Sequence, residues 1–495
     1  MCFLDRGQFG SQQKRTVTHR IRPHQQAQYS KHNYSAASGD RSGGDNVSKH
    51  SSKRALSAAS IGNFGEIYDF AVFGFSVPFI AAHFFPGTDP VAAILRTFAV
   101  YAVAFVARPM GGLVFGYMLD KIGRIKVLAI TIWLMAAGTA MIGLIPTYDT
   151  IGIAAPILLV VGRLAQGFAM GGETTGSTSF ILEAAPDRGR GRWVGVIWFF
   201  AHIPNAFVAL MLLGMQLSFG MDTYLDWAWR VPFLLGGLIG IIGWWLRRNL
   251  DDPEEYTRAT GKAQFKNPLR AMTRSGWKSM MYLAMIQPLQ TVGSYLLLGF
   301  MYTFLVKQAG LASIAALVSN AAAIVVLAAA IPIGGAMSDR WGRKTILSLG
   351  ALWIALVVYP SISLASNGTL VEAVIGQTLI AIGVGLYGGA CFVAAAEFFP
   401  THFRATGHAL SYQTTVAVLG GTTPLVSAWL VSALDSPLAP GWYVTFVAII
   451  CLILVRFVPE TKGVDLSTSV DPHSAEQAGH SAITRRTAAS IETIK

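Results

Sequence analysis

Long apolar stretches alternate with short polar connections through most of the chain. Between Ala58 and Val458, twelve such stretches follow one another. Each is long enough to cross a bilayer as a helix, which takes roughly 20 apolar residues. We predict helices over residues 58–84, 94–118, 127–145, 151–182, 193–217, 231–246, 280–306, 311–337, 346–364, 370–399, 407–434 and 442–458. The pattern therefore predicts an all-α membrane protein with six helices on each side of a longer central connection.

The composition agrees with a membrane protein and excludes several other classes. Of 495 residues, 53% are hydrophobic and only 13% are charged, which is too little charge to cover a soluble globule of this size. The cysteines are Cys2, Cys391 and Cys451, and they form neither a disulfide framework nor a Cys-rich metal site. We expect no metal and no cofactor. The motifs H-E-x-x-H, G-x-S-x-G and the P-loop do not occur, so we do not expect an enzyme.

The chain has a formal net charge of +12, and among the connections between the apolar stretches the cations lie in every second one. The cations of these connections are Lys121, Arg124, Lys126, Arg188, Arg190, Arg192, Arg340, Arg343, Lys344, Arg404 and those of the central connection. The alternate connections, near residues 86–90, 147–150, 220–226 and 365–368, contain no Lys or Arg. Such a bias marks the cytoplasmic side. We therefore predict a multi-pass inner-membrane protein with both termini in the cytoplasm, whose charge serves orientation and not nucleic-acid binding.

These features divide the chain into five parts. Residues 1–54 are polar and basic, without an apolar period or the apolar core of a signal peptide, and predict a disordered cytoplasmic tail. Residues 55–246 and 280–462 predict two six-helix bundles, joined by a cytoplasmic linker of mixed charge over residues 247–279. Residues 463–495 predict a second polar cytoplasmic tail.

An internal repeat relates the two halves. The segment G-Y-M-L-D-K-I-G-R from Gly116 matches G-A-M-S-D-R-W-G-R from Gly335, at an offset of 335 − 116 = 219 residues. A second pair, E-A-A-P-D-R-G-R from Glu183 and E-F-F-P-T-H-F-R from Glu397, has an offset of 397 − 183 = 214 residues. Two unrelated motifs with nearly the same period indicate a duplicated six-helix unit, and hence two pseudo-symmetric bundles.

The repeated pattern G-x-x-x-D-[KR]-x-G-R resembles the signature loop of the major facilitator superfamily. Its glycines allow close helix approach and a tight turn, and its aspartate can meet a helix N-terminus or an arginine. The resemblance implies a cytoplasmic gate, which we assign to Gly116, Asp120, Gly123, Arg124, Glu183, Arg190, Asp339, Gly342, Arg343, Glu397 and Arg404. It also implies that helices one, four, seven and ten line a central cavity.

Four further segments resemble the metabolite:H+ symporter family, whose members carry proline, betaine, α-ketoglutarate, citrate or shikimate. They are G-N-F-G-E-I-Y-D-F from Gly62, F-V-A-R-P-M-G-G-L-V-F-G from Phe105, R-L-A-Q-G-F-A-M-G-G-E from Arg163 and E-F-F-P-T-H-F-R-A-T-G-H-A-L-S-Y-Q from Glu397. The likeness spans about residues 58–460. The chain departs from the family at Gly171, where G-G-E-T-T-G replaces G-G-E-Y-G-G, and its C-terminal tail lacks a coiled coil, so osmotic gating is not expected.

Acidic residues inside the apolar stretches are candidates for proton coupling, because ionisable groups in a membrane are costly and face a cavity or a partner. Glu66 and Asp69 lie three residues apart on one helix face and are suited to share a proton. The alternative is that both are structural partners of arginines such as Arg108. Glu173 is a further proton-coupling candidate.

Polar residues within the predicted helices are candidates for substrate binding. Arg108 and Arg163 can each clamp a carboxylate, although the arginine of the R-x-x-Q-G pattern also serves as a structural partner in the superfamily. The other candidates are His202, Gln287, Gln290, Tyr295, Gln377 and Tyr412. Together they indicate an anionic or zwitterionic substrate.

We therefore predict a proton-coupled symporter of a small organic acid or zwitterionic metabolite, working by alternating access. A proton-linked exporter or a facilitated uniporter is the alternative among transporters, and a transporter-like nutrient sensor is the alternative from another class. Residues 200–206 lack the G-P-x-x-G-G motif of antiporters, which disfavours the exporter. The partners expected are the substrate, protons and the lipid bilayer. The sequence identifies neither the substrate nor the oligomeric state, for which a monomer is our expectation.

Overall fold

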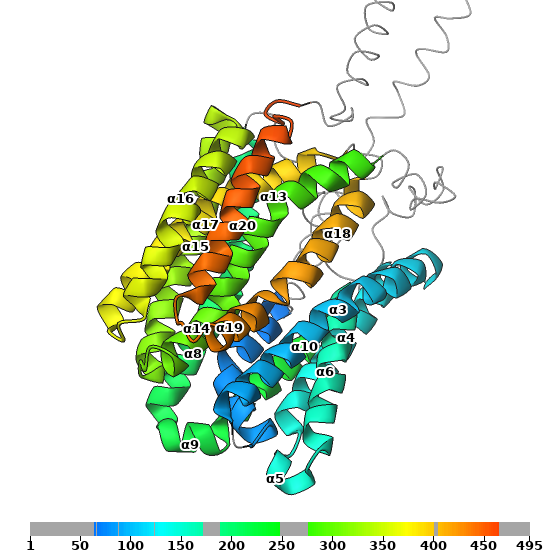
Figure 1. The fold of residues 1–495 in the computed structure, drawn as a ribbon. Coiled ribbons are helices and arrows are strands. Elements are labelled where there is room, and N and C mark those ends of the chain that lie inside the picture. The colour runs from blue at the N-terminus through cyan, green and yellow to red at the C-terminus, as the bar shows by residue number, and fades with distance from the viewer. Residues whose placement is uncertain are drawn as a thin grey trace, which may run out of the picture. The chain divides into compact units, whose positions relative to one another are not determined.

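The computed structural model describes residues 64–65, 67–87, 89–122, 124–171, 189–247, 276–399 and 404–464 (Figure 1). Ser57–Lys495 is one compact unit. Glu66, Glu173, Glu183 and Gly123 lie outside the described residues, as do the two predicted tails apart from residues 463–464. The side chains of Asp120, Arg124 and Arg404 and the surroundings of Gly116 are likewise outside the described part of the chain. The predictions made for all these residues therefore stay predictions.

The described part of the N-terminal half contains six long helices. They are the first helix (Ile67–Phe84), α3 (Pro90–Ile122), α4 (Arg124–Leu144), α6 (Ala154–Gly171), α8 (Arg190–Phe219) and α10 (Val231–Arg247). Three short helices, α5 (Tyr148–Ile151), α9 (Met221–Asp226) and η1 (Ala228–Arg230), connect them at one end. In Figure 1, α5 and α9 both lie at the bottom of the molecule.

The C-terminal half has the same number of spans, and π-helical turns interrupt two of them. The seventh span consists of α13 (Trp277–Tyr295), the π-helical η2 (Leu296–Phe300) and α14 (Met301–Lys307). The eleventh consists of α18 (Arg404–Thr415), the π-helical η3 (Val416–Gly420) and α19 (Thr423–Ala433). The others are α15 (Ser313–Trp341), α16 (Arg343–Ala365), α17 (Leu370–Glu397) and α20 (Ala439–Leu454), followed by η4 (Val455–Phe457).

The prediction of twelve membrane-spanning helices is confirmed, and the differences are at their ends. α3 begins at Pro90 instead of residue 94, because proline is favoured in the first turn of a helix. α20 begins at Ala439, with Pro440 in the corresponding place, instead of residue 442. α13 begins at Trp277, within the predicted linker. The two π turns were not predicted, because the hydrophobic pattern continues through them.

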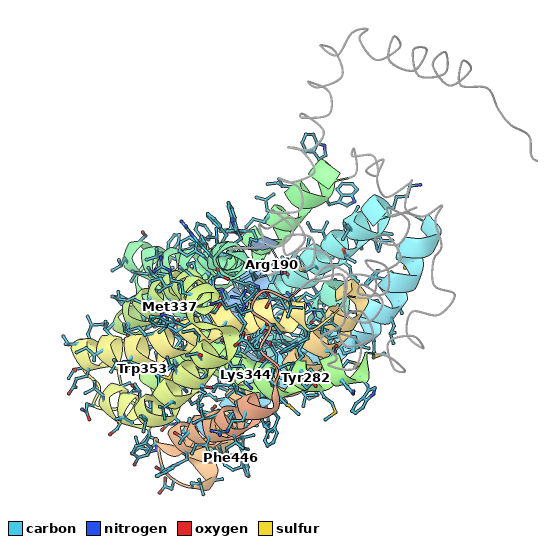
Figure 2. The ribbon with its side chains drawn as sticks, turned by 90° about the horizontal axis from the view of Figure 1, so that it is seen from above. Arg190, Tyr282, Met337, Lys344, Trp353 and Phe446 are labelled. Carbon is cyan, nitrogen blue, oxygen red and sulfur yellow. The ribbon has the colours of Figure 1, made fainter. Side chains whose placement is uncertain are left out.

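Each half packs as its own bundle. α6 lies between α3 and α4, and α4 also packs on α10; in the second half α17 lies between α15 and α16, and α16 packs on α20. Figure 1 shows α3, α4, α6 and α10 on one side, and α15, α16, α17 and α20 on the other. Large apolar side chains such as Phe446, which is 64% exposed, cover the outer faces (Figure 2). The outer surface is therefore suited to contact lipid.

The two ends of the molecule differ in charge. One end, here called the basic end, carries the cations at the start of α4, α8 and α16 and after α15 and α20. They include Lys126, Arg192, Arg340, Lys344 and Lys462. The other end, here called the opposite end, carries α5, α9 and the connections without Lys or Arg.

The two bundles meet most closely where α8 packs on α15. A Cβ atom at Gly191 would lie 2.4 Å from the carbonyl oxygen of Gly335, and one at Gly195 would lie 2.6 Å from Cα of Pro332. Real Cβ atoms do not approach backbone this closely, so these glycines are required by the contact. The contact forms the seam between the halves near the basic end.

We expect Gly195→Leu to disrupt this seam, because the new side chain meets backbone that cannot rotate away. Overpacking of this kind costs about 1–3 kcal/mol. The melting temperature of the purified protein should fall, measured by scanning fluorimetry in detergent. Gly214→Leu on the same helix is the matched control, since nothing lies within 4 Å of a Cβ at Gly214. Equal melting temperatures for the two variants would contradict the close contact.

Candidate transport cavity

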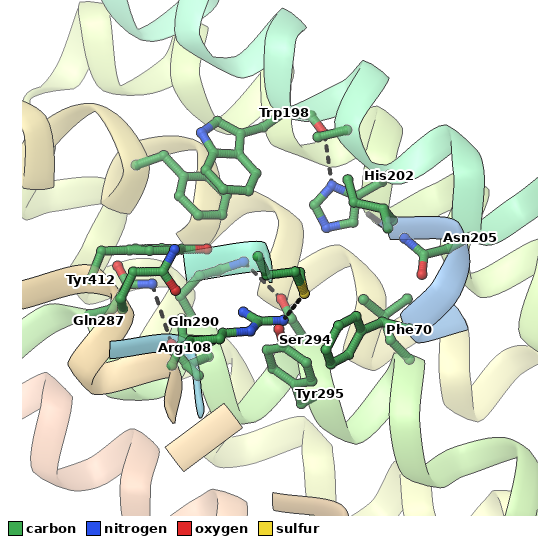
Figure 3. Close-up of a pocket in the computed structure, with 18 of the residues that line it drawn as sticks. Phe70, Arg108, Trp198, His202, Asn205, Gln287, Gln290, Ser294, Tyr295 and Tyr412 are labelled. Carbon is green, nitrogen blue, oxygen red and sulfur yellow. Dashed lines mark hydrogen bonds between the residues drawn. The ribbon is translucent and has the colours of Figure 1, made fainter. Parts of the chain in front are cut away.

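A cavity of about 170 Å³ lies between the two bundles. The first helix, α3, α6 and α8 line it from the N-terminal half, and α13, α17 and α18 line it from the C-terminal half, with one residue each from η2 and η3 (Figure 3). The expectation that helices one, four, seven and ten line the cavity is therefore incomplete. The second, fifth and eleventh spans contribute as well, while α6 and α17 contribute only Met170 and Phe392 among the described residues.

Arg108 places a positive charge in this cavity. It lies on α3, is 4% exposed, and donates from Nη2 to Sδ of Met170 at 3.2 Å. Its guanidinium carbon lies 4.5 Å from the ring centre of Phe70 and 4.2 Å from that of Phe105. Nε is buried without a hydrogen-bond partner among the described residues. A thioether is a weak acceptor. Within the described ranges no carboxylate pairs with Arg108, and its charge lies against aromatic faces.

Histidine and asparagine side chains from α8 extend this wall. His202 hydrogen-bonds through Nδ1 to the carbonyl oxygen of Trp198 at 2.7 Å, which leaves Nε2 as the nitrogen for other contacts. Asn205 lies one turn further along the helix and also lines the cavity. In Figure 3 both side chains lie on the same side of the cavity as Phe70. This wall therefore offers neutral polar groups beside the charge of Arg108.

The facing wall is neutral and rich in amides. Gln287, Gln290 and Ser294 follow one another at helical spacing on α13 and share one face. Gln290 donates to the hydroxyl oxygen of Ser294 at 3.0 Å, while its own Oε1 is buried without a partner in the described part of the chain. The same is true, among the described residues, of Oε1 of Gln413 on α18. Two acceptors on this wall are thus available to a polar ligand.

Aromatic rings close the cavity between the bundles. The indole of Trp198 on α8 stacks on the ring of Phe392 on α17, with ring centres 3.8 Å apart and planes 5° apart. Tyr412 on α18 lies 6.1 Å from the same indole, and His408 stacks on Tyr412 at 5.8 Å. Val194 and Ile331 pack beneath the stack, toward the basic end. The stack therefore joins the two bundles across the cavity.

Most of the predicted substrate residues line the cavity. They are Arg108, His202, Gln287, Gln290, Tyr295 and Tyr412. Trp198, His408 and Phe392 also line the cavity and were not predicted. Spacing could have identified the first two, because Trp198 lies four residues before His202 and His408 four before Tyr412, which places each pair on one helix face.

Arg163 and Gln377 are absent from the lining of the cavity that the described residues form, and their contact with substrate stays a prediction. The guanidinium of Arg163 is fully buried behind the cavity wall, over the rings of Phe70 and Phe73. Gln377 is buried in the C-terminal bundle, where it accepts from Asn320 at 2.9 Å and donates to Ser319 at 2.6 Å. Both side chains thus hydrogen-bond within their own bundle, although Nε of Arg163 is buried without a partner among the described residues.

Asp69 ends a buried hydrogen-bond chain in the N-terminal bundle. Arg163 donates to Oε1 of Gln166 at 3.0 Å, and Nε2 of Gln166 donates to the hydroxyl oxygen of Thr139 at 2.7 Å. Thr139 in turn donates to Oδ2 of Asp69 at 2.6 Å. Asp69 is 3% exposed and does not line the cavity. The bundle thus holds a buried acid and a buried base, connected by two neutral side chains.

Comparison with known proteins gives the family. The model of the sugar (and other) transporter family matches residues 55–267 and 248–469. The proline/betaine transporter of Escherichia coli K12 is 33% identical over 422 residues, covering 83% of this chain and 84% of its own length. The citrate-proton symporter of Klebsiella pneumoniae is 32% identical over 423 residues, covering 84% of this chain and 94% of its own.

The chain belongs to the sugar (and other) transporter family. Among solved structures, a D-xylose-proton symporter matches the fold with a TM-score of 0.67, at 20% identity, covering 83% of this chain and 99% of the symporter. The xylose transporter of Escherichia coli in a partially occluded inward-open conformation matches with a TM-score of 0.65, at 18% identity, covering 82% and 98%. The predictions of a major facilitator fold and of a transporter are confirmed.

The second copy of the signature loop of this transporter is tied into the basic end. Asp339 accepts from the backbone N–H groups of Gly191 and Arg192 at 2.9 Å each, at the N-terminus of α8. Arg343 pairs with Asp339 at 2.6 Å and with Glu397 at 3.0 Å. Gly342 has φ +95°, a turn conformation that favours glycine. The aspartate therefore meets both a helix N-terminus and an arginine.

The segment after α20 completes this cluster. Glu460 accepts from the backbone N–H groups of Arg343 and Lys344, at 2.8 and 3.1 Å, and so caps α16. The hydroxyl of Thr461 donates to Glu397 at 2.6 Å, and Arg190 donates to the carbonyl oxygen of Val464 at 2.8 Å. The assignment of these residues to a gate stays a prediction; their geometry joins α8, α15, α16 and α17 at one point.

Proposed function

We propose that the protein moves a small carboxylate-bearing metabolite across the membrane together with protons, by alternating access. The observation that carries the proposal is the guanidinium of Arg108 in the cavity between the bundles, where no carboxylate of the described residues pairs with it. An arginine binds carboxylates through parallel charge-assisted hydrogen bonds. A substrate carboxylate would supply the anion that the described residues do not supply.

The remaining cavity groups favour a substrate with one carboxylate and further polar groups. The facing wall offers the buried oxygens of Gln290 and Gln413, which accept hydrogen bonds, and its described lining residues include no Asp, Glu, Lys or Arg. Proline, betaine and citrate, which the relatives' names mention, all carry a carboxylate. They form the panel with which we would begin.

Asp69 is the proton site in this proposal. No cation of the described residues hydrogen-bonds to Asp69, and a buried carboxylate in such a place is costly when ionised, so it has reason to take up a proton during the cycle. The chain through Thr139 and Gln166 links it to Arg163, whose guanidinium packs on Phe70 of the cavity wall. Glu66 and Glu173 remain proton-coupling candidates outside the described residues.

The contacts between the bundles support alternating access. Toward the opposite end, the rings of Phe98 and Phe300 lie 6.3 Å apart, and those of Phe75 and Tyr302 lie 5.7 Å apart. Ser313 donates to Gln216 at 2.9 Å, which ties α15 to α8 there. These contacts join the two bundles toward the opposite end. Because cations mark the cytoplasmic side, we propose an inner-membrane protein whose basic end and termini face the cytoplasm, acting as a monomer.

The test is uptake by proteoliposomes containing the full chain. We expect uptake of at least one member of the panel to rise about tenfold when the outside is made one to two pH units more acidic than the lumen, and to fall when a protonophore removes the gradient. Uptake that ignores the gradient would indicate a uniporter, and accumulation against the proton flow an exporter. Binding of a panel compound without any flux would indicate a sensor, and each of these results overturns the proposal.

A further inference from the structure

Thr139 lies between two acceptors in the buried hydrogen-bond chain. Its hydroxyl oxygen lies 2.6 Å from Oδ2 of Asp69 and 2.9 Å from the carbonyl oxygen of Met135. A hydroxyl has one hydrogen, so it donates to one of these acceptors at a time. The same oxygen also accepts from Nε2 of Gln166 at 2.7 Å. The hydroxyl of Thr139 can therefore donate either to Asp69 or to the carbonyl oxygen of Met135, while its oxygen accepts from Gln166 in both cases.

The orientation of Gln166 is set by its other neighbour. Its Oε1 accepts from Arg163, which has donors only, so its amide nitrogen must face Thr139. Arg163 in turn donates to the carbonyl oxygen of Tyr101 at 3.3 Å. Tyr101 is one of the residues that line the cavity. The direction of every hydrogen bond from Arg163 to Thr139 is therefore determined, and only the hydroxyl hydrogen of Thr139 is free to choose.

Few other groups act on Asp69. Of the charged and titratable groups in the described ranges, Arg163 of α6 and Tyr68 of its own helix face it. Tyr68 donates its hydroxyl away from Asp69, to the carbonyl oxygen of Pro232 at 2.8 Å. α4 contributes Thr139, and α10 contributes Gly236, where a Cβ would lie 3.0 Å from Oδ1. Thr139 is thus the hydrogen-bond donor that the described residues direct at this carboxylate.

We propose that Thr139 is a positioning residue that senses the protonation of Asp69 by reversing its hydroxyl. With Asp69 ionised, the hydroxyl donates to Oδ2. When a proton binds Oδ2, that proton is donated to the oxygen of Thr139, and the hydrogen of Thr139 turns to the carbonyl oxygen of Met135. No hydrogen bond is lost in either state, because the oxygen of Thr139 accepts from Asp69 and Gln166 together. The inference rests on the proposed role of Asp69 as the proton site.

The consequence is a defined effect on the pH dependence of transport. The bond from Thr139 stabilises ionised Asp69, and a donor to a charged group is worth more than a neutral bond. When the hydrogen bond from Thr139 is removed, Asp69 keeps its proton to a higher pH. Thr139→Val preserves the shape of the side chain and removes the donor. We expect it to move the midpoint of the pH dependence of uptake upward by about one pH unit.

The experiment measures that midpoint in proteoliposomes containing the full chain, with equal pH on both sides and exchange of labelled substrate. Thr139→Ser retains the hydroxyl and should return the midpoint to within about 0.3 pH unit of the natural protein. Thr131→Val is the matched control, because among the described residues the hydroxyl of Thr131 on the same helix donates to the carbonyl oxygen of Leu128 and not to a carboxylate. It should leave the midpoint unchanged.

The outcomes separate this inference from the proposed function. If exchange by the natural protein depends on pH but folded Thr139→Val has the same midpoint, the inference alone is overturned. The same holds if Thr139→Val lowers the rate of exchange and the melting temperature without shifting the midpoint. A natural protein whose exchange does not depend on pH would overturn the proton site itself. Should Thr139→Val fail to fold, Thr139→Cys carries the test, since a weak thiol donor predicts a smaller shift in the same direction.

Discussion

Arg108→Gln is expected to reduce substrate uptake about 100-fold. Among the described residues that line the cavity, Arg108 is the one Lys or Arg. A substrate carboxylate that pairs with its guanidinium accepts two charge-assisted hydrogen bonds. Losing them costs about 3 kcal/mol, and each 1.4 kcal/mol is a factor of ten. Glutamine keeps the length and polarity of the side chain but has no charge. The measurement is the initial rate of uptake in proteoliposomes over a range of substrate concentrations.

Two controls locate the effect of this substitution. Arg108→Lys keeps the charge without the fork geometry and should retain partial uptake with a raised KM. Arg96→Gln removes an exposed arginine of the same helix, outside the cavity, and should leave uptake within about twofold of the natural rate. If Arg108→Gln transports normally while Arg96→Gln does not, the charge of the cavity is not what binds the substrate.

The hydrophobic pattern is sufficient to predict the spans of this fold but not their irregularities. Apolar length decides whether a helix crosses a bilayer, so all twelve spans follow from the chain. The π turns at Leu296–Phe300 and Val416–Gly420 leave that pattern unchanged. They depend on contacts with distant residues; Asn320, for example, donates to the carbonyl oxygen of Leu297 at 3.0 Å. Such contacts cannot be read from one segment alone.

The cavity residues are predictable by type but not by direction. Arg108 and Arg163 are both arginines within apolar helices, and nothing local distinguishes them. The rotation of each helix in its bundle turns Arg108 into the cavity and Arg163 behind Phe70. Close helix approach sets that rotation: a Cβ at Gly167 would lie 1.8 Å from the carbonyl oxygen of Ala104, so α6 meets α3 on its glycine face. Sequence indicates which residues are unusual, and packing decides which of them meet the substrate.

Asp69→Asn is expected to abolish accumulation driven by a proton gradient while leaving exchange of labelled substrate within about threefold of the natural rate. Asparagine has nearly the same shape and accepts the hydrogen bond of Thr139, so the bundle should keep its packing. It cannot bind a proton, however, and a carrier without its proton site retains only passive movement of substrate between the two openings. The measurement compares gradient-driven uptake with counterflow in the same proteoliposomes.

Asp226→Asn is the matched control, because Asp226 is an exposed acid of α9 at the opposite end. It should support both activities at natural rates. If Asp69→Asn loses both exchange and accumulation at an unchanged melting temperature, the carboxylate acts in a step that both activities share. Full accumulation in that variant would move the proton site elsewhere, to Glu66 or Glu173. Because exchange needs the substrate site and accumulation needs both sites, the ratio of the two activities separates the role of Asp69 from that of Arg108.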